Sequence, residues 1–373
     1  MPADPGERIP VCSSSLAGKE AEYLAECVKT GWISSSGPFV KRFEEQFAAW
    51  CGVRFGISAN SGTSALHLAL AALGVGPGDE VIVPSLTIIA CANVVVLCGA
   101  TPVLADVDPE TGCISAEAAA RCVTARTKAI MPVHLYGFPC NVAALPSRSP
   151  AGPIAVVEDA AEAIGTELSG KRAGALGTVG AFSFFANKVV TTGEGGMAVT
   201  DDPDRALRLR RFRDQWFVPE RRFFHPDIGF SYRISNVQAA LGVAQLERVS
   251  ELVRARIDVA ARYRSLFEGL HELELPPEAP RGSMNCHWMY AVRVASRKPG
   301  VRDALAAHLA ACGIETRTFF IPLHRQPPYR QLPAHCPVSD DWSERGLLLP
   351  TGPLLTLGQQ ERVASEVRRF FRA

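Results

Sequence analysis

The sequence predicts an α/β protein in which a large, mainly parallel sheet covered by helices is followed by a smaller α+β unit. Two observations predict this class. Over the first two-thirds of the chain, short apolar runs of strand character alternate with helical segments, as in repeated β-α units. After about residue 245 this alternation gives way to one long amphipathic stretch and a few mixed elements. We therefore expect a large domain over residues 1–245 and a small C-terminal domain over residues 246–373.

Seven segments of the first part have the composition of strands, and several are apolar on both faces. Such runs are typical of parallel strands that helices cover on both sides. The last two follow each other too closely for a crossover helix, so we expect them to be antiparallel neighbours. The expected strands are residues 54–60, 80–85, 101–108, 128–136, 154–160, 180–186 and 195–201, with helices at 64–74, 88–99 and 202–214.

The C-terminal part begins with a long amphipathic helical stretch, residues 237–270, which could tie the two domains together. Shorter elements of both kinds follow it. The expected strands are residues 288–295 and 314–320, and the expected helices are residues 302–313 and 357–372.

Composition limits the class of protein. The chain has 373 residues, 47% of them hydrophobic, which is enough for a large core. Its net charge of +1 gives no general attraction to nucleic acid or to an anionic membrane. The apolar runs are shorter than the ~20 residues that cross a bilayer, and no secretory signal is evident. The eleven cysteines form no CxxC pair, so we expect reduced thiols in a cytoplasmic protein and no metal site.

The turn Ser61-Gly62-Thr63-Ser64 lies between an expected strand and an apolar helix. A helix start offers unpaired N–H groups and the positive end of the helix dipole, which together suit a phosphate. An ordinary N-cap is the competing interpretation, because serine and threonine often cap helices. His67, within the same helix, is expected to be a packing residue.

Two adjacent carboxylates, Glu158 and Asp159, end the expected strand at residues 154–160. Alternation along a strand sends them to opposite faces, so one site can use only one of them directly. A carboxylate at this end of a strand lies where α/β sheets bind ligands, and it could pair with a protonated pyridine nitrogen. A salt-bridge role remains the alternative.

Lys188 stands between the apolar FSFF and VV segments and is followed by the glycine-rich turn TTGEGG. A lysine in apolar surroundings tends to lose its proton and becomes a nucleophile. Most lysines lie at the surface, but this context makes Lys188 a candidate catalytic residue.

Taken together, these segments resemble the DegT/DnrJ/EryC1/StrS family of sugar aminotransferases, which use pyridoxal 5′-phosphate (PLP) and have the fold type I, aspartate aminotransferase-like architecture. The resemblance covers nearly the whole chain and rests on an ordered set of motifs. Within the family, the chain looks closest to C4 aminotransferases of GDP-linked sugars. The motifs include SANSGTSALHLALAAL, TKAIMPVHLYG, VVEDAAEAIG, FSFFANKVVTTGEGGM, GFSYRISNVQAALGVAQLERV and IPLHRQPPY.

The resemblance assigns roles to individual residues. Lys188 would bind PLP covalently and act as general acid and base, Asp159 would pair with the pyridine nitrogen, and Glu162 would bind the phenolic oxygen. The phosphate would be held by Gly62, Thr63 and Ser183. Tyr232 and Arg233 would reach the neighbouring subunit's site, and His324 would come near the sugar. The resemblance thus implies a homodimer with active sites at its interface.

Two positions depart from the family pattern. Many relatives have an aromatic residue where Ile88 stands, stacking on the PLP ring, and an aliphatic side chain can still pack there. Relatives usually have asparagine where Ser231 stands, as a phosphate contact across the dimer. Both changes bear on how the cofactor is held.

The implied reaction is transfer of an amino group from L-glutamate to a nucleotide-linked keto sugar, at C4 of a GDP-4-keto-6-deoxymannose-like acceptor. The alternatives are a C3-keto sugar, a dTDP carrier, a keto-cyclitol, a non-catalytic PLP-binding regulator or a PLP-dependent sugar dehydratase. Dehydratases of this family generally have histidine at the lysine position, so Lys188 argues against that last alternative.

Overall fold

A seven-stranded sheet forms the larger part of the molecule. The computed structural model describes residues 8–218, 220, 221 and 223–372. Strand β11 pairs antiparallel with both of its neighbours, and the remaining neighbouring strands pair parallel. This confirms the mainly parallel sheet and the one antiparallel pair expected within it. The strand order is β1 (Phe55–Ala59), β11 (Gly196–Thr200), β10 (Val179–Ser183), β7 (Ala155–Asp159), β4 (Thr127–Ile130), β2 (Glu80–Pro84) and β3 (Thr101–Ala105).

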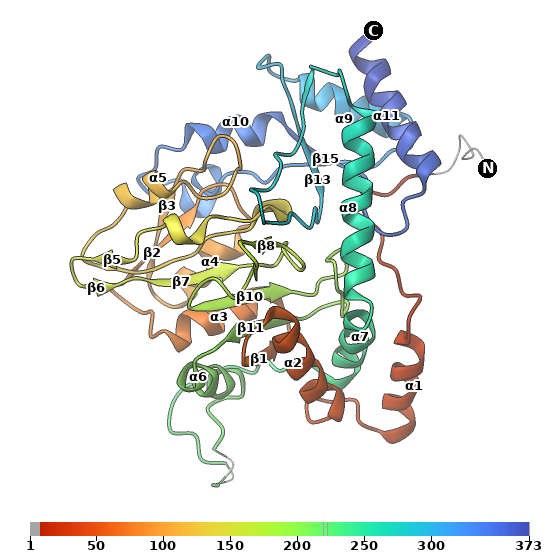
Figure 1. Ribbon diagram of the computed structural model, residues 1–373. Helices are drawn as coiled ribbons and strands as arrows, with labels where there is room; N and C mark the ends of the chain where they lie inside the picture. Colours follow the sequence, from red (N-terminus) through yellow and green to blue (C-terminus); the bar gives the residue numbers. More distant parts are fainter. Residues whose placement is uncertain (1–7, 219, 222, 373) are drawn as a thin grey trace.

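Helices cover both faces of this sheet (Figure 1). One face packs against α3 (Gly62–Ala72), α4 (Ala90–Leu97) and α6 (Pro203–Arg213). The other face packs against α2 (Pro38–Cys51) and α7 (Asn236–Leu246), and α1 (Glu20–Thr30) lies against α7. On this second face the ring of Phe47 lies 4.9 Å from that of Phe182, and the ring of Phe43 lies 4.9 Å from that of Phe184. Successive side chains of β10 therefore point alternately into the hydrophobic core on each face of the sheet.

A smaller antiparallel sheet follows, in the order β12 (Leu273–Glu274), β13 (Tyr290–Val294), β15 (Gly346–Leu349) and β14 (Arg317–Thr318). It shares a separate core with α8 (Val249–Leu266), α9 (Val301–Ala311) and α11 (Leu357–Arg372). The N-terminal segment also reaches this part, because Ile9 bridges to Ile314 and Cys12 to Thr351. The domain boundary at residue 245 stays a prediction.

The remaining elements are short. They are α5 (Ala116–Arg121) and α10 (Pro337–Arg345), the ribbons β5 (Arg148–Ser149) with β6 (Gly152–Pro153) and β8 (Glu167–Leu168) with β9 (Lys171–Arg172), and the 3-10 turns η1 (Leu135–Gly137), η2 (Val142–Ala144), η3 (Leu323–Arg325) and η4 (Pro327–Tyr329).

Three expected elements differ from the structure. The stretch 237–270 forms two helices, α7 and α8, which are separated at Glu247 and Arg248, where the backbone leaves helical geometry at Arg248. The Glu247 carboxylate accepts hydrogen bonds from Tyr23 and Arg42. The expected strand 128–136 ends at Ile130 and continues only as an isolated bridge. The expected strand 314–320 shortens to β14, since Ile314 pairs with the N-terminal segment instead.

Within the described residues, no helix is both long and apolar enough to span a lipid bilayer.

The buried amide of Asn236, at the start of α7, joins this helix to α2 and to the loop that follows α1. Its Oδ1 accepts from Phe39 N at 2.8 Å, and its Nδ2 donates to Trp32 O at 2.7 Å. Gly37 lies so close that a Cβ there would come within 2.5 Å of the amide. Asn236 is only 1% exposed, so water cannot replace these bonds.

Replacing Asn236 with alanine should lower the free energy of unfolding by roughly 1–3 kcal/mol, because the buried amide of Phe39 loses its hydrogen-bond partner. Urea denaturation measures the change. Asn141→Ala, at an exposed asparagine, is the matched control and should change stability by less than about 0.5 kcal/mol. Equal losses in the two variants would contradict the assigned role.

Candidate active site

The candidate site forms where strands of the large sheet end beside the start of α3. Strand β7 ends at Asp159, and its parallel neighbour β10 ends at Ser183. A Cβ added to Gly62 would lie 2.7 Å from Cβ of Ser183, so α3 begins directly against the end of β10. Only glycine permits this approach. Gly62 and Ser183, which the family resemblance assigns to one phosphate site, therefore lie together.

The start of α3 has both an ordinary N-cap and unpaired amides that suit a phosphate. Ser61 caps the helix, since its Oγ accepts from Ser64 N at 3.0 Å. The amides of Gly62 and Thr63 belong to the first turn, where helix geometry provides no intrahelical acceptor. Thr63 is exposed, and the Ser183 hydroxyl lies on the neighbouring strand end. This arrangement of amides, hydroxyls and a helix dipole can bind a phosphate.

Glu158 and Asp159 point to different surroundings, as alternation predicts. Asp159 is 2% exposed, and its carboxylate accepts from Ala161 N at 3.0 Å and from Cys91 Sγ at 3.1 Å. Glu158 is fully buried and accepts from Gly174 N at 2.8 Å and Leu176 N at 2.7 Å. It also lies 3.0 Å from His134 Nε2. Glu158 is therefore a structural anchor for the loop after β9.

Lys188 and Glu162 form the titratable centre of the site. Lys188 Nζ lies 3.9 Å from Glu162 Oε1, and the two side chains are 11% and 6% exposed. Burial lowers the pKa of Lys188, against the attraction of Glu162 and Asp159. Burial raises the pKa of Glu162 to about 7, against the attraction of Lys188 and the hydrogen bond from Tyr136 N. An amine that loses its proton easily can act as a nucleophile and as an acid–base group.

The segment before Lys188 is held from two sides. Trp288 Nε1 donates to Asn187 O at 2.9 Å, and Lys188 Nζ lies 3.7 Å from the centroid of the Trp288 indole. The Ser14 hydroxyl donates to Ala186 O. Asn187 Oδ1 is a buried oxygen with no hydrogen-bond partner in the part of the chain that the structure describes. A polar group left over beside Lys188 fits a site built to hold another molecule.

Cys91 and Trp288 are contacts of the site that sequence reasoning missed. Nothing in the runs TIIACANVV and WMYAVRVA separates either residue from an ordinary core side chain. Cys91 contacts the carboxylate of Asp159, and Trp288 covers the amine of Lys188; both partners lie far away along the chain.

Ile88 lies one helical turn before Cys91, whose amide donates to Ile88 O at 3.2 Å. Its side chain is 41% exposed, although the flanking Leu86 and Thr87 are buried. Ile88 is thus an exposed apolar side chain three residues before Cys91, which contacts Asp159. A side chain in this position can cover the face of a flat ligand.

The GFSYRISN segment makes its contacts around α3 and α6. The Tyr232 hydroxyl lies 3.1 Å from His67 Nδ1, and Tyr232 O accepts from Asn60 N at 2.8 Å. Arg233 pairs with Asp214 and donates to Ser231 Oγ at 3.0 Å. His67 is 6% exposed and contacts the ring of Phe230, which confirms its packing role.

His324 lies at the end of β2. Its Nδ1 is 2.7 Å from Ser85 Oγ, and its Nε2 is 3.1 Å from Asp340 Oδ1. Both ring nitrogens thus have partners within the chain, so a contact with a substrate would require one of these bonds to break.

Comparisons with known proteins agree with this geometry. The model of the DegT/DnrJ/EryC1/StrS aminotransferase family matches residues 14–368. A GDP-perosamine synthase of Caulobacter vibrioides is 46% identical over 95% of this chain and 96% of that protein. A GDP-perosamine synthase of Vibrio cholerae is 39% identical over 97% and 99%. The solved aminotransferase TlmJ of Streptoalloteichus hindustanus superposes with a TM-score of 0.92 at 34% identity, covering 98% of this chain and 99% of that one.

The raised pKa of Glu162 predicts a pH-dependent stability. The unfolded chain ionises this carboxyl near its ordinary pKa of 4.5, whereas the folded protein keeps it protonated up to about pH 7. Its contribution to stability is therefore complete below pH 4.5 and is lost as the pH rises to about 7. In cofactor-free protein, the unfolding free energy of the wild type relative to Glu162→Gln should fall by about 3 kcal/mol across that window.

Denaturant unfolding at a series of pH values measures this difference. Glu268→Gln, at an exposed position, controls for the loss of one carboxylate. A wild-type-minus-variant difference that stays constant from pH 4.5 to 7 would show that Glu162 is not desolvated beside Lys188.

Proposed function

The chain belongs to the DegT/DnrJ/EryC1/StrS aminotransferase family, and on that basis we propose that it transfers an amino group from L-glutamate to C4 of GDP-4-keto-6-deoxymannose. The observation that carries this proposal is the buried amine of Lys188, which lies 3.9 Å from the Glu162 carboxyl. The acceptor is supported by the relatives named GDP-perosamine synthase, which are up to 46% identical over almost the whole chain.

The enzyme is PLP-dependent, as its family is. PLP, when bound, supplies the electron sink that loosens a bond at the substrate carbon. The donor set of the site fits this cofactor. Gly62, Thr63 and Ser183 would hold its phosphate, Asp159 its ring nitrogen and Glu162 its phenolic oxygen, while Ile88 would cover the ring face.

Lys188 has two tasks in this proposal. Its low pKa leaves a fraction of the amine uncharged and able to bind the cofactor covalently. Once displaced by an amino substrate, the same amine would take a proton from the substrate carbon and deliver it to the cofactor carbon C4′. The Trp288 ring, 3.7 Å from Nζ, limits where the amine can move and keeps water from it.

Asp159 acts through its charge. The bonds from Ala161 N and Cys91 Sγ fix the carboxylate at the end of β7 and satisfy it while buried. A fixed negative charge there would keep the cofactor's ring nitrogen protonated, which strengthens the electron sink. Glu158, engaged by backbone amides on the other side of the strand, would take no direct part.

The working unit in this proposal is a homodimer in the cytoplasm. Ser231, Tyr232 and Arg233 would serve the partner subunit's site, with Arg233 released from Asp214 when it binds an anionic group. His324 would stay near the sugar through its bond to Ser85. All eleven cysteines are free, which is consistent with a reducing compartment.

The acceptor assignment predicts a ranking of substrates. With L-glutamate as donor, GDP-4-keto-6-deoxymannose should be aminated with a kcat/KM at least about tenfold above that of a dTDP-linked 4-keto sugar or a 3-keto sugar nucleotide. Chromatography of the amino sugar and coupled detection of 2-oxoglutarate measure both products. Lys188→Ala is the inactive control. Amination of the 3-keto or dTDP substrate in preference would reassign the acceptor and leave the aminotransferase function intact.

The shared-site proposal predicts complementation between two inactive variants. If Arg233 serves the partner's site, Lys188→Ala and Arg233→Ala homodimers should both be strongly impaired. In the mixed dimer, two-fold symmetry places both lesions in one site and leaves the other whole, with up to about half the native activity per heterodimer. Co-expression with two affinity tags gives the heterodimer for assay. An inactive heterodimer would place both residues in one subunit's site or make Arg233 structural.

A further inference from the structure

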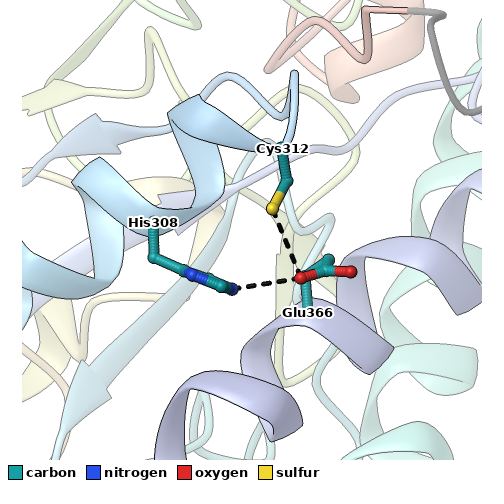
Figure 2. A group of neighbouring side chains, drawn as sticks. All are labelled: His308, Cys312 and Glu366. Atoms are coloured by element: carbon teal, nitrogen blue, oxygen red, sulfur yellow. Dashed lines mark hydrogen bonds and ion pairs between the residues drawn. The ribbon is translucent and has the colours of Figure 1, made fainter.

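A histidine, a cysteine and a glutamate converge between α9 and α11, next to the small sheet. His308 and Cys312 lie one helical turn apart at the end of α9, and Glu366 faces them from α11 (Figure 2). His308 Nε2 lies 3.1 Å from Glu366 Oε2, and Cys312 Sγ lies 3.3 Å from the same oxygen. The ligand-type atoms of all three residues lie within 4.8 Å of one another.

These separations are close to those of a metal centre. Zinc binds sulfur at about 2.3 Å and nitrogen or oxygen at about 2.0–2.2 Å. In a tetrahedral site the ligand atoms then lie about 3.3–3.7 Å apart. The two pairs that include Glu366 would need to separate by only a few tenths of an ångström to admit the ion, and the His308 and Cys312 ligand atoms lie within 4.8 Å of each other. Two ligands four residues apart on one helix face are a spacing that zinc sites use.

The charges and exposure of the cluster also suit a divalent cation. On binding, the Cys312 thiol gives its proton to solvent, and the resulting thiolate and the Glu366 carboxylate balance the two positive charges of the metal. Two cations, Arg369 and Arg362, lie near the cluster. Arg369 Nη1 is 3.8 Å from Glu366 Oε1, on a mostly exposed side chain that can turn away. Arg362 donates to Cys312 O at 2.6 Å and supports the helix end. His308 and Glu366 are 27% and 19% exposed, which leaves a fourth position open to water.

We propose that His308, Cys312 and Glu366 bind one Zn²⁺ ion, with water as the fourth ligand. The mixed thiolate, imidazole and carboxylate set favours zinc over the hard cations Mg²⁺ and Ca²⁺. The ion links α9 to α11 across 54 residues of sequence and fastens the C-terminal helix to the small sheet. It is a structural site, separate from the chemistry of Lys188. The expectation that the scattered cysteines leave no metal site does not hold in this proposal.

Zinc binding to the chelator-treated, PLP-loaded protein tests the site. Equilibrium dialysis against buffered free Zn²⁺, followed by elemental analysis, should find about one tightly bound ion per chain. X-ray absorption should show one sulfur neighbour at about 2.3 Å together with nitrogen or oxygen neighbours. Zinc should raise the thermal midpoint of the wild type, whereas Mg²⁺ and Ca²⁺ should not.

Cys312→Ser, His308→Ala and Glu366→Gln should each weaken binding of this ion at least about tenfold and remove the thermal shift. The matched controls Cys122→Ser and His271→Ala should bind zinc as the wild type does. Unchanged aminotransferase activity without zinc shows that the variants are folded. Zinc bound equally by wild type and Cys312→Ser, absence of a sulfur neighbour, or no bound zinc at all would overturn the proposal.

Discussion

The burial of the Lys188 amine opposite the Glu162 carboxyl is the constraint on which the site depends. Two ionisable groups 3.9 Å apart are removed from water, and burial favours the uncharged form of each against the attraction of the other. Such a pair is tolerated only where the remaining polar atoms have partners. Tyr136 supplies one partner, since its amide donates to Glu162 Oε2 at 2.8 Å.

The backbone around this pair is shaped to supply those partners. Tyr136 has a φ of 53° and Gly137 a φ of 99°, a tight turn that directs the Tyr136 amide at Glu162. A Cβ on Gly137 would lie 2.8 Å from Trp288 N, so this glycine lets the tryptophan segment approach. Trp288 then covers Lys188 and holds Asn187. The left-handed turn, the close approach and the covered amine therefore form one connected arrangement, built from loops beside the large sheet and from the segment that precedes β13.

The sequence predicted the seven strands of the large sheet and the C-terminal helix at residues 357–372, because their apolar periodicity is local. Alternation also predicted that the carboxylates of Glu158 and Asp159 meet different surroundings, since it depends only on the strand, whereas the choice of Asp159 for the site came from the family resemblance. The break between α7 and α8 could not be predicted, because the amphipathic pattern of residues 237–270 continues through Glu247 and Arg248. The contacts of Cys91 with Asp159 and of Cys312 with Glu366 are likewise tertiary and leave no spacing signal.

The most direct measurement of the central claim is the position at which PLP is attached. The protein should be isolated yellow, and sodium borohydride should fix the cofactor onto the chain in a form that survives proteolysis. Peptide mapping should then recover it on the peptide that contains Lys188, and the Lys188→Ala protein should carry none. Recovery of the cofactor on another lysine, or equal labelling of Lys188→Ala, would contradict the account of Lys188 as the buried amine that binds the cofactor.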